Sequence, residues 1–313
     1  MKPGLVIMRA IYEPTIAELE RDFTVHRLWL QKDADAFLRE RGANVKVVIT
    51  TTPYGFSPAD FAWFPELELL GCFGPYYTLI DRGTARQRGI AVTHTPGSTA
   101  EPVADLAMGM IIAAMRRLCE SDRFVRAGKW TAGVFPAGTE VRGKTCGIIG
   151  FGRIGREIAR LAGAFGMRIC YHGPRRKDDV EFEYFAELEA MAHAADCLVV
   201  TCALTETTRD LVDARILAAL GPNGYLVNVA RGPIVDEDAL IAALGDGTIA
   251  GAALDVFRDE PQVPAALREM DNVVLAAHIG TSTKEVREHR HRMLLEDVRA
   301  YLEGRPLSYP VPL

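Results

Sequence analysis

The chain has 313 residues, of which 49% are hydrophobic and 25% charged, and its formal net charge is −5. This length suits two globular domains with cores of ordinary size. Acidic and basic residues are mixed along the whole sequence, which excludes a basic stripe for nucleic acid and a lysine-rich patch for membranes.

The beginning of the chain and its cysteines bear on the compartment. Only a short apolar run, Leu5–Met8, precedes the first charged stretch, and no later segment is long enough to span a membrane. We therefore expect a cytoplasmic protein with no membrane or nucleic-acid partner. The six cysteines form no CxxC pair, and Cys146, Cys170 and Cys197 lie in apolar runs. This pattern indicates buried thiols in a reducing compartment, with neither a disulfide framework nor a metal site.

The first third of the chain alternates short apolar runs with polar or helical stretches. The runs are Leu5–Met8, Val45–Ile49, Leu67–Phe73 and Ile90–Val92. This rhythm predicts a small parallel α/β unit. Pro96-Gly97 then ends the pattern, and Ser98-Thr99-Ala100-Glu101 predicts a capping box that opens a helix with Pro102 in its first turn.

A second and more regular alternation follows. Its predicted strands are Cys146–Ile149, Arg168–Tyr171, Leu198–Thr201, Tyr225–Val229, Ala250–Val256 and Val273–Ala276. Helices between them, connected by right-handed crossovers, give a parallel doubly wound sheet. The last stretch, Lys284–Leu302, is predicted to be a charged helix that crosses back to the first unit. Its candidate buried positions are Val286, Met293, Leu294, Val298 and Leu302.

A glycine-rich turn follows the strand predicted at Cys146–Ile149. Its sequence is Gly150-Phe151-Gly152-Arg153-Ile154-Gly155, and a helix begins within it. In this context Gly150 allows the tight turn, Gly152 lets the backbone approach a pyrophosphate, and Gly155 lets the helix and strand pack closely. The phosphates would lie against free N–H groups at the positive end of the helix dipole. The sequence therefore predicts a dinucleotide-binding site.

The residues after the next predicted strand bear on which dinucleotide binds. An NAD enzyme usually places a carboxylate about 20 residues beyond the turn, where it holds the ribose 2′-hydroxyl. Here the strand ends at Tyr171-His172 without an acid, and Arg175, Arg176 and Lys177 follow. Arginine forks bind a 2′-phosphate well. This favours NADP over NAD, although a solvated basic loop would have the same sequence.

At this point the sequence resembles the D-isomer-specific 2-hydroxyacid dehydrogenases, particularly their glyoxylate/hydroxypyruvate reductase branch. The resemblance covers most of the chain and is densest from Val103 to Thr283. Several ordered motifs carry it, with spacing similar to that of the family. They are Val103–Ala107, Gly150–Gly155, Ala230–Asp236, Leu254–Phe257 with Glu260-Pro261, and His278–Gly280.

The resemblance implies an architecture and an assembly. The fold class would be α/β, with two doubly wound parallel-sheet domains, a Rossmann coenzyme domain and a flavodoxin-like substrate domain, and a cleft between them. Residues 1–97 and 286–313 would form the substrate domain, and residues 98–285 the dinucleotide-binding domain. The helix from Ser98 and the segment after it resemble the family's dimer-forming region, so a homodimer is expected. Apolar residues there are Trp130, Val134 and Phe135.

The resemblance also implies catalytic roles that the residue chemistry supports. Arg231 would bind the carboxylate and the keto oxygen of a small-molecule 2-keto acid with its planar guanidinium. His278 would donate a proton to the keto oxygen as hydride arrives, and would accept it in the reverse direction. Glu260 would pair with His278 and stabilise the imidazolium, so that the group remains an acid near neutrality. Asp255 would help to hold the nicotinamide end.

The turn, the basic loop and the resemblance together give a set of candidate cofactor-binding residues. These are Gly150, Phe151, Gly152, Arg153, Ile154, Gly155, His172, Arg175, Arg176, Leu204, Thr205, Thr208, Val229, Ala230, Arg231, Asp255, His278 and Gly280. The candidate substrate-binding residues are Pro75, Tyr76, Arg231 and His278. No metal site is expected.

One loop departs from the family pattern. The family's carboxylate-binding loop usually reads Gly-Val-Gly-Tyr-Asp and offers backbone N–H groups, whereas this chain has Gly74-Pro75-Tyr76-Tyr77-Thr78. Pro75 has no N–H to donate, and Tyr76 stands where the family has glycine. Either the N–H groups of Tyr76 and Tyr77 take over, or the substrate is different.

Three functional hypotheses follow. The first is hydride transfer from NAD(P)H to a 2-keto acid of the glyoxylate or hydroxypyruvate type, which gives the D-2-hydroxy acid. The second is reduction of a bulkier 2-keto acid, such as 2-ketogluconate or an aromatic one, which Tyr76 and Tyr77 motivate. The third and more remote one is a dinucleotide-sensing binding protein. The presence of Arg231, Glu260 and His278 argues against the third.

Overall fold

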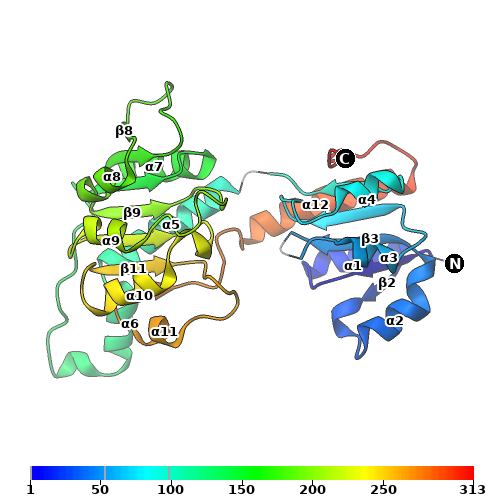
Figure 1. The fold of residues 1–313 in the computed structure, drawn as a ribbon. Coiled ribbons are helices and arrows are strands. Elements are labelled where there is room, and N and C mark those ends of the chain that lie inside the picture. Colours follow the sequence, from blue (N-terminus) through cyan, green and yellow to red (C-terminus); the bar gives the residue numbers. More distant parts are fainter. Residues whose placement is uncertain (1, 53, 98) are drawn as a thin grey trace. The chain divides into compact units, whose positions relative to one another are not determined.

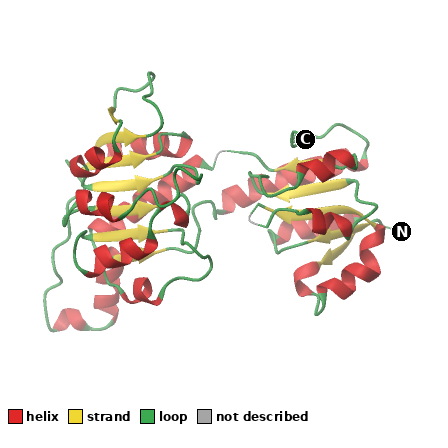
Figure 2. Cartoon of the chain, in the orientation of Figure 1, coloured by secondary structure: helices red, strands yellow, loops and turns green. Residues whose placement is uncertain are grey.

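The computed structural model describes residues 2–52, 54–97 and 99–313, and Figure 1 shows their course. The chain forms two compact units, Met1–Ser98 with Thr283–Leu313 (unit 1), and Thr99–Ser282 (unit 2). Figure 2 shows that each unit contains both helices and strands. Within the described residues, no helix combines the length and the apolar character needed to cross a lipid bilayer.

Unit 1 contains a parallel sheet whose strand order is β2-β1-β3-β4-β5. Its strands are β1 (Gly4–Ile7), β2 (Thr24–Arg27), β3 (Val45–Thr51), β4 (Leu69–Phe73) and β5 (Ala91–His94). The direction of winding reverses between β1 and β3, so this edge of the sheet has the switch point at which ligands gather in doubly wound folds. The predicted small parallel unit is confirmed.

Both faces of the unit 1 sheet are covered. Successive strand residues face opposite sides. Val48 therefore belongs to one apolar cluster, while Val47 and Ile49 belong to the other. The helices of the unit are α1 (Glu13–Asp22), η1 (Leu28–Leu30), α2 (Ala34–Arg41), η2 (Gly42–Asn44), α3 (Pro58–Ala62), α4 (Arg82–Gln87) and α12 (Lys284–Leu302).

The C-terminal helix α12 has the bounds that the sequence predicts and packs in unit 1 against α1, β4 and β5. Val286, Met293, Leu294 and Val298 are buried as predicted, but Leu302 is 44% exposed. The prediction for Leu302 is wrong because the helix ends there, beyond the sheet it covers. Buried Asp297 fixes the helix, since its carboxylate accepts bonds from the Thr93 hydroxyl of β5 and from two amides of the C-terminal tail.

Unit 2 contains a second parallel sheet, with the order β12-β11-β10-β9-β6-β7-β8. Its strands are β6 (Thr145–Ile149), β7 (Arg168–His172), β8 (Glu183–Phe185), β9 (Cys197–Val200), β10 (Tyr225–Asn228), β11 (Gly251–Leu254) and β12 (Val273–Leu275). The chain starts at central β6, winds outward to β8, and then returns through β9 to β12. The predicted doubly wound sheet is confirmed, and its switch point lies between β6 and β9.

Helices cover both faces of the unit 2 sheet as well. Leu198 and Val200 of β9 face one apolar cluster, and Cys197 and Val199 face the other. The helices are α5 (Ala100–Met115), α6 (Leu118–Arg126), η3 (Lys129–Thr131), α7 (Arg153–Ala164), α8 (Leu188–Ala194), α9 (Ala214–Leu220), η4 (Gly232–Ile234), α10 (Glu237–Gly245) and α11 (Ala265–Glu269).

Two local features differ from the sequence prediction. Strands β2 and β8 were not predicted. Ser98, the first residue of the predicted capping box, lies outside the described residues, and the N-cap of α5 is Thr99, whose side chain makes no capping bond.

Cys146, Cys170 and Cys197 are buried free thiols. Burial raises the pKa of the last two to about 12, which keeps them protonated and unreactive.

Candidate active site

The glycine-rich turn joins β6 to the N-terminus of α7, and its three glycines have different surroundings. Gly150 has φ +95°, and a Cβ there would lie 2.6 Å from Cys202 Cα. A Cβ on Gly155 would lie 2.4 Å from the Gly150 carbonyl oxygen, so this residue sets the close approach of helix and turn. Gly152 instead has open space around its Cβ position and is the N-cap of α7 without a side-chain cap. The free N–H groups at this helix end are therefore accessible to a phosphate.

The side chains of Thr201 and Phe151 stabilise this turn through contacts within unit 2. Thr201, just after β9, donates from Oγ1 to the carbonyl oxygens of Gly150 at 2.5 Å and Ile149 at 3.2 Å. The Phe151 ring is buried against Tyr171, with the ring centroids 4.4 Å apart. Of the candidate cofactor residues in the turn, Phe151 can therefore offer only its backbone. Thr201 was missed by the sequence analysis, although a threonine ending an apolar run was a visible signal.

The loop after β7 carries the two arginines that bear on the choice of dinucleotide. The side chains of Arg175 and Arg176 are exposed, and the described residues include no hydrogen-bond or ion-pair partner for either of them. The nearby carboxylate of Asp179 pairs instead with Arg156 at 2.9 Å. His172 is fixed by its Nδ1, which lies 3.0 Å from the Phe185 carbonyl oxygen of β8. Two guanidinium groups are thus free to bind an anion at this point.

The loop after β9 holds three further candidate cofactor residues. The Thr208 hydroxyl accepts a bond from the Thr205 amide at 2.7 Å and donates to the Ala203 carbonyl oxygen at 2.7 Å. These bonds fix a compact turn that includes half-buried Leu204. Val229 and Ala230, the candidates after β10, are buried.

The carboxyl ends of β10, β11 and β12, which are neighbours in the sheet, bring the predicted catalytic residues to one edge. Arg231 follows β10, and buried Asn228 positions it by accepting from the Ala230 amide at 3.0 Å and donating to the Arg231 carbonyl oxygen at 3.0 Å. The Arg231 guanidinium is exposed and donates to the Ala230 carbonyl oxygen at 2.6 Å. A Cβ on Gly232 would lie 2.0 Å from the Phe257 carbonyl group, so the Arg231 loop lies directly against the loop after β11.

His278 and Glu260 form an ion pair at this edge. His278 Nδ1 lies 2.6 Å from Glu260 Oε2, and the other carboxylate oxygen accepts from the Phe257 amide at 3.1 Å. The remaining ring nitrogen, Nε2, has no partner within residues 2–52, 54–97 and 99–313. A carboxylate that orients one imidazole nitrogen leaves the other free to exchange a proton with a bound molecule.

Asp255 fixes the backbone at His278. Its two carboxylate oxygens accept from the amides of Ile279 at 2.7 Å and Gly280 at 2.9 Å, while its carbonyl oxygen accepts from the His278 amide. His278 itself has φ +52°, in the left-handed region. Burial raises the pKa of Asp255, and the two amide bonds oppose that rise. The sequence analysis assigned Asp255 to the nicotinamide end but did not foresee this clamp.

In unit 1, the loop Gly74–Thr78 follows β4 at the carboxyl edge of the sheet. The Pro75 carbonyl oxygen lies 3.0 Å from His94 Nδ1, and the Tyr76 carbonyl oxygen accepts from Thr52 Oγ1 at 3.1 Å. In a trans peptide the C=O and the next N–H point in opposite directions. The amides of Tyr76 and Tyr77 therefore point away from His94 and Thr52, and neither has an acceptor in the described part of the chain.

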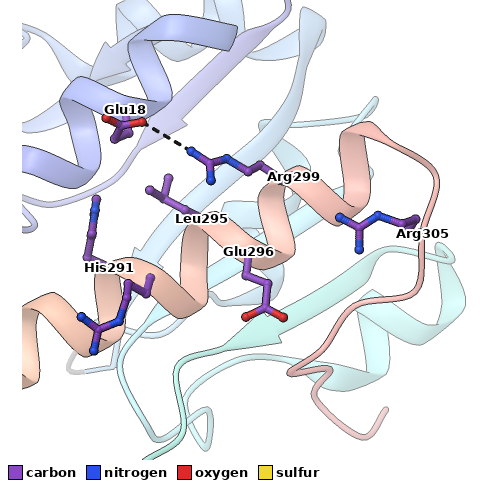
Figure 3. Close-up of a pocket in the computed structure, with 7 residues that line it drawn as sticks. Glu18, His291, Leu295, Glu296, Arg299 and Arg305 are labelled. Atoms are coloured by element: carbon purple, nitrogen blue, oxygen red, sulfur yellow. Dashed lines mark hydrogen bonds and ion pairs between the residues drawn. The ribbon is translucent and has the colours of Figure 1, made fainter.

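One hollow of about 420 Å³ lies elsewhere in unit 1, beside α1 and α12 (Figure 3). Its lining includes Arg292, Arg299 and Arg305, and Glu18 pairs with Arg299 at 3.4 Å. None of the predicted site residues lines it. Among the residues that the structure describes, no three His, Cys, Asp or Glu side chains gather into a set that could hold a metal ion.

Comparisons with known proteins agree with this geometry. The profile of the D-isomer specific 2-hydroxyacid dehydrogenase NAD-binding domain matches residues 108–280. A glyoxylate/hydroxypyruvate reductase A from Arabidopsis thaliana is 42% identical over 308 residues, which cover 98% of each chain. A hydroxyphenylpyruvate reductase from Plectranthus scutellarioides is 37% identical over 308 residues, again 98% of each chain.

A solved structure is similar throughout its length. It is an NADPH-dependent glyoxylate/hydroxypyruvate reductase from Sinorhizobium meliloti in complex with NADP and malonate. The TM-score is 0.82 and the sequence identity 35%, with 99% of this chain and 97% of that chain covered.

Proposed function

Because the chain belongs to the family of D-isomer-specific 2-hydroxyacid dehydrogenases, we propose that it reduces a small 2-keto acid of the glyoxylate or hydroxypyruvate type to the D-2-hydroxy acid. One observation carries this proposal. The His278–Glu260 pair lies at the sheet edge where Arg231 also stands, in the unit that carries the dinucleotide turn. A nicotinamide dinucleotide supplies the hydride.

The roles of the three residues follow from their contacts. His278 donates a proton from Nε2 to the keto oxygen, because its Nδ1 is held by Glu260. Glu260 stabilises the imidazolium before the transfer. The exposed Arg231 guanidinium binds the substrate carboxylate and polarises the keto oxygen, since it has no carboxylate partner in the described part of the chain. Asp255 and Gly280 hold the turn at His278 and border the nicotinamide.

The preferred coenzyme in this proposal is NADPH. Arg175 and Arg176 are exposed cations without recorded partners in the described residues, and no acid ends β7 at His172. These features suit a 2′-phosphate. The similar structure from Sinorhizobium meliloti is itself NADPH-dependent and contains NADP. The glycine turn, with its open approach at Gly152, accommodates the pyrophosphate of either coenzyme.

Replacing both Arg175 and Arg176 by alanine is expected to weaken NADPH selectively, by at least tenfold in KM, or about 1.4 kcal/mol. NADH should be nearly unaffected, because its ribose lacks the 2′-phosphate. Initial rates with each coenzyme measure this effect. The double variant Arg215→Ala with Arg268→Ala, which also removes two exposed arginines from unit 2, serves as the control. A native preference for NADH would mean that the loop is only solvated surface.

A substrate panel tests the main function. Initial-rate reduction of glyoxylate, hydroxypyruvate, 2-ketogluconate and phenylpyruvate with each coenzyme should give the highest kcat/KM for one of the first two. Highest activity with phenylpyruvate or 2-ketogluconate would favour the bulkier-substrate alternative. Half-exposed Tyr76 motivates that alternative, as does the likeness to a hydroxyphenylpyruvate reductase. Any turnover rules out a binding protein without activity.

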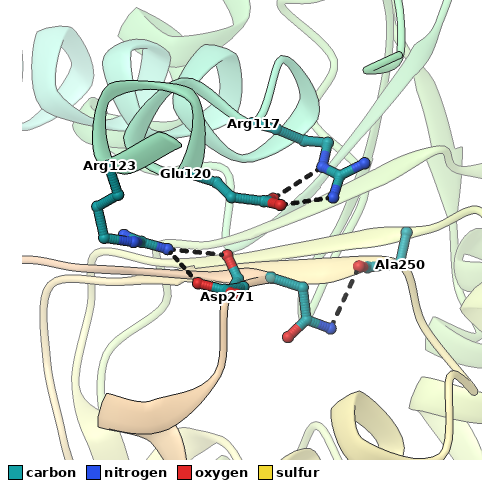
Figure 4. A network of polar contacts seen from close by, with 6 residues as sticks. Arg117, Glu120, Arg123, Ala250 and Asp271 are labelled. Carbon is teal, nitrogen blue, oxygen red and sulfur yellow. Dashed lines mark hydrogen bonds and ion pairs between the residues drawn. The ribbon is translucent and has the colours of Figure 1, made fainter. Parts of the chain in front are cut away.

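A homodimer is a further part of the proposal. No residue of α6 is buried, and beyond this helix Trp130 is 68% and Val134 is 93% exposed. Figure 4 shows the polar contacts around α6, of which the pair Arg123–Asp271 at 2.8 Å links this helix to the residues just before β12. A fixed helix with an uncovered apolar face suits a second copy of the chain. The free thiols suit a cytoplasmic compartment.

Replacing Trp130 and Val134 by aspartate is expected to convert the dimer to monomer, because each buried charge would be unpaired in the interface. Light scattering coupled to size exclusion measures the mass. Leu302→Asp, which alters an exposed apolar residue of α12, should leave the dimer intact. A native protein that is already monomeric at micromolar concentration would overturn this assignment.

A further inference from the structure

The loop between β7 and β8 carries Arg175 and Arg176, the two exposed arginines that suit a 2′-phosphate. Residues 174–181 of this loop make no hydrogen bond between backbone groups within the described part of the chain. A long side chain on a loosely held loop loses much conformational freedom when it binds an anion, and this loss weakens binding. The loop therefore needs other contacts if the two guanidinium groups are to be in position before a coenzyme binds.

Two tyrosine hydroxyls supply such contacts. The hydroxyl of Tyr171 in β7 accepts a hydrogen bond from the Lys177 amide at 2.7 Å. The hydroxyl of Tyr184 in β8 donates to the Gly173 carbonyl oxygen at 3.1 Å. The two bonded residues stand directly on either side of the segment 174–176, which includes both arginines. The backbone on each side of the arginines is therefore fixed by a bond to a side chain.

The two tyrosines are themselves held firmly. They are register partners in the parallel pair β7–β8, and their ring centroids lie 5.3 Å apart. The Tyr171 side chain is fully buried, and its ring packs on that of Phe151 in the glycine-rich turn. A row of three rings thus connects this turn with the loop of the arginines. Rings packed in this way place their hydroxyls with little freedom of movement.

An ion pair adds a third fixed point to the loop. The carboxylate of Asp179, two residues beyond Lys177, pairs with Arg156 of α7 at 2.9 Å. This contact gives the carboxylate a partner in the neighbouring helix. The charges of the two arginines of the loop therefore stay available to a bound anion.

We propose that Tyr171 and Tyr184 are positioning residues for the 2′-phosphate of NADPH, because their hydroxyls hold the loop in the shape in which its two arginines receive this group. The inference rests on the proposed preference for NADPH. Neither hydroxyl binds the phosphate itself, and both act through the arginines. Positioned guanidinium groups lose less freedom on binding, so the affinity for a 2′-phosphate rises, whereas the affinity for a ligand without one does not.

The test uses Tyr171→Phe and Tyr184→Phe, each of which removes one hydroxyl and keeps the ring. Calorimetry measures the binding of adenosine 2′,5′-bisphosphate and of 5′-AMP, which differ only in the 2′-phosphate. We expect each variant to weaken binding of the bisphosphate about 3- to 10-fold, the usual effect of one lost hydrogen bond between neutral groups. Binding of 5′-AMP should change less than twofold.

The matched control is Tyr225→Phe. Tyr225 is also buried in the sheet of unit 2, and its hydroxyl lies 2.9 Å from Thr139 Oγ1 at the amino end of β10. This edge of the sheet is opposite to the one from which the loop of the arginines leaves. The control variant should therefore bind both nucleotides within twofold of the native protein.

A second comparison separates positioning from a general effect on the fold. In a chain that already carries Arg175→Ala and Arg176→Ala, Tyr171→Phe should have no further effect on either nucleotide, because the groups that it positions are absent. The inference is overturned if Tyr171→Phe weakens both nucleotides equally, if its effect persists without the arginines, or if it behaves like Tyr225→Phe. Should Tyr171→Phe be unstable, Tyr184→Phe, at a half-buried residue, gives the same decision.

Failure of the proposed coenzyme preference is distinguishable from failure of this inference. In the first case the native protein binds the two nucleotides equally well. In the second case the native protein prefers the bisphosphate, and Tyr171→Phe keeps that preference. Neither measurement requires turnover of a keto acid.

Discussion

Replacing His278 by alanine is expected to lower kcat for keto-acid reduction by about 10²-fold or more, the loss typical of a general acid. The reason is the ion pair with Glu260, which leaves Nε2 as the free proton donor. His278 has φ +52°, a conformation that alanine adopts poorly. His278→Asn is the sharper variant, because asparagine tolerates the left-handed region but transfers no proton. Both variants should be equally inactive.

One control and one variant of the partner residue accompany this experiment. His193→Asn changes an exposed histidine of α8 and should leave kcat unchanged. Glu260→Gln replaces the carboxylate whose Oε2 lies 2.6 Å from His278 Nδ1, so the ring is held less firmly and kcat for reduction should fall. A His278→Asn enzyme with native kcat would contradict the assignment of His278 as the acid.

Replacing Arg231 by glutamine is expected to lower kcat/KM by about 10²- to 10³-fold, since several charge-assisted hydrogen bonds would be lost together. Arg231 binds the keto oxygen as well as the carboxylate in this proposal, so both kcat and KM should worsen. Arg231→Lys should recover little, because lysine offers no planar fork.

Arg268→Gln, which alters an exposed arginine of α11, is the control for Arg231. Coenzyme affinity needs its own titration, because Arg231 is also a candidate cofactor contact. If Arg231→Gln changed coenzyme affinity alone, with normal kcat at saturation, the residue would belong to the dinucleotide site and the substrate assignment would fail.

The sequence by itself determined the doubly wound sheet of unit 2 and the dinucleotide turn. Buried parallel strands need continuous apolar runs, and Cys146–Ile149 is such a run. The structure gives a steric reason for Gly150 and Gly155, where a Cβ would clash with Cys202 and with the Gly150 carbonyl oxygen, and the open space at Gly152 leaves the helix end accessible. The position of Arg231 and His278 at one edge of the sheet was also predictable, because each follows a parallel strand of that sheet, whereas their catalytic roles remain predictions.

Short strands were beyond the sequence. β2 and β8 have four and three residues, and both are only partly buried. Their existence depends on pairing with β1 and β7, which supply the register. A short half-exposed segment carries too little periodicity to be recognised alone.

The tertiary structure also decided how the site is held. Asn228 and Asp255 act through hydrogen bonds to loops, and nothing in their local sequence shows which amides they bind. Thr93 and Asp297 are 204 residues apart in the sequence, and only the packing of α12 against β5 brings them together. Local patterns fix which segments become strands and turns, whereas contacts between distant segments depend on how those elements pack.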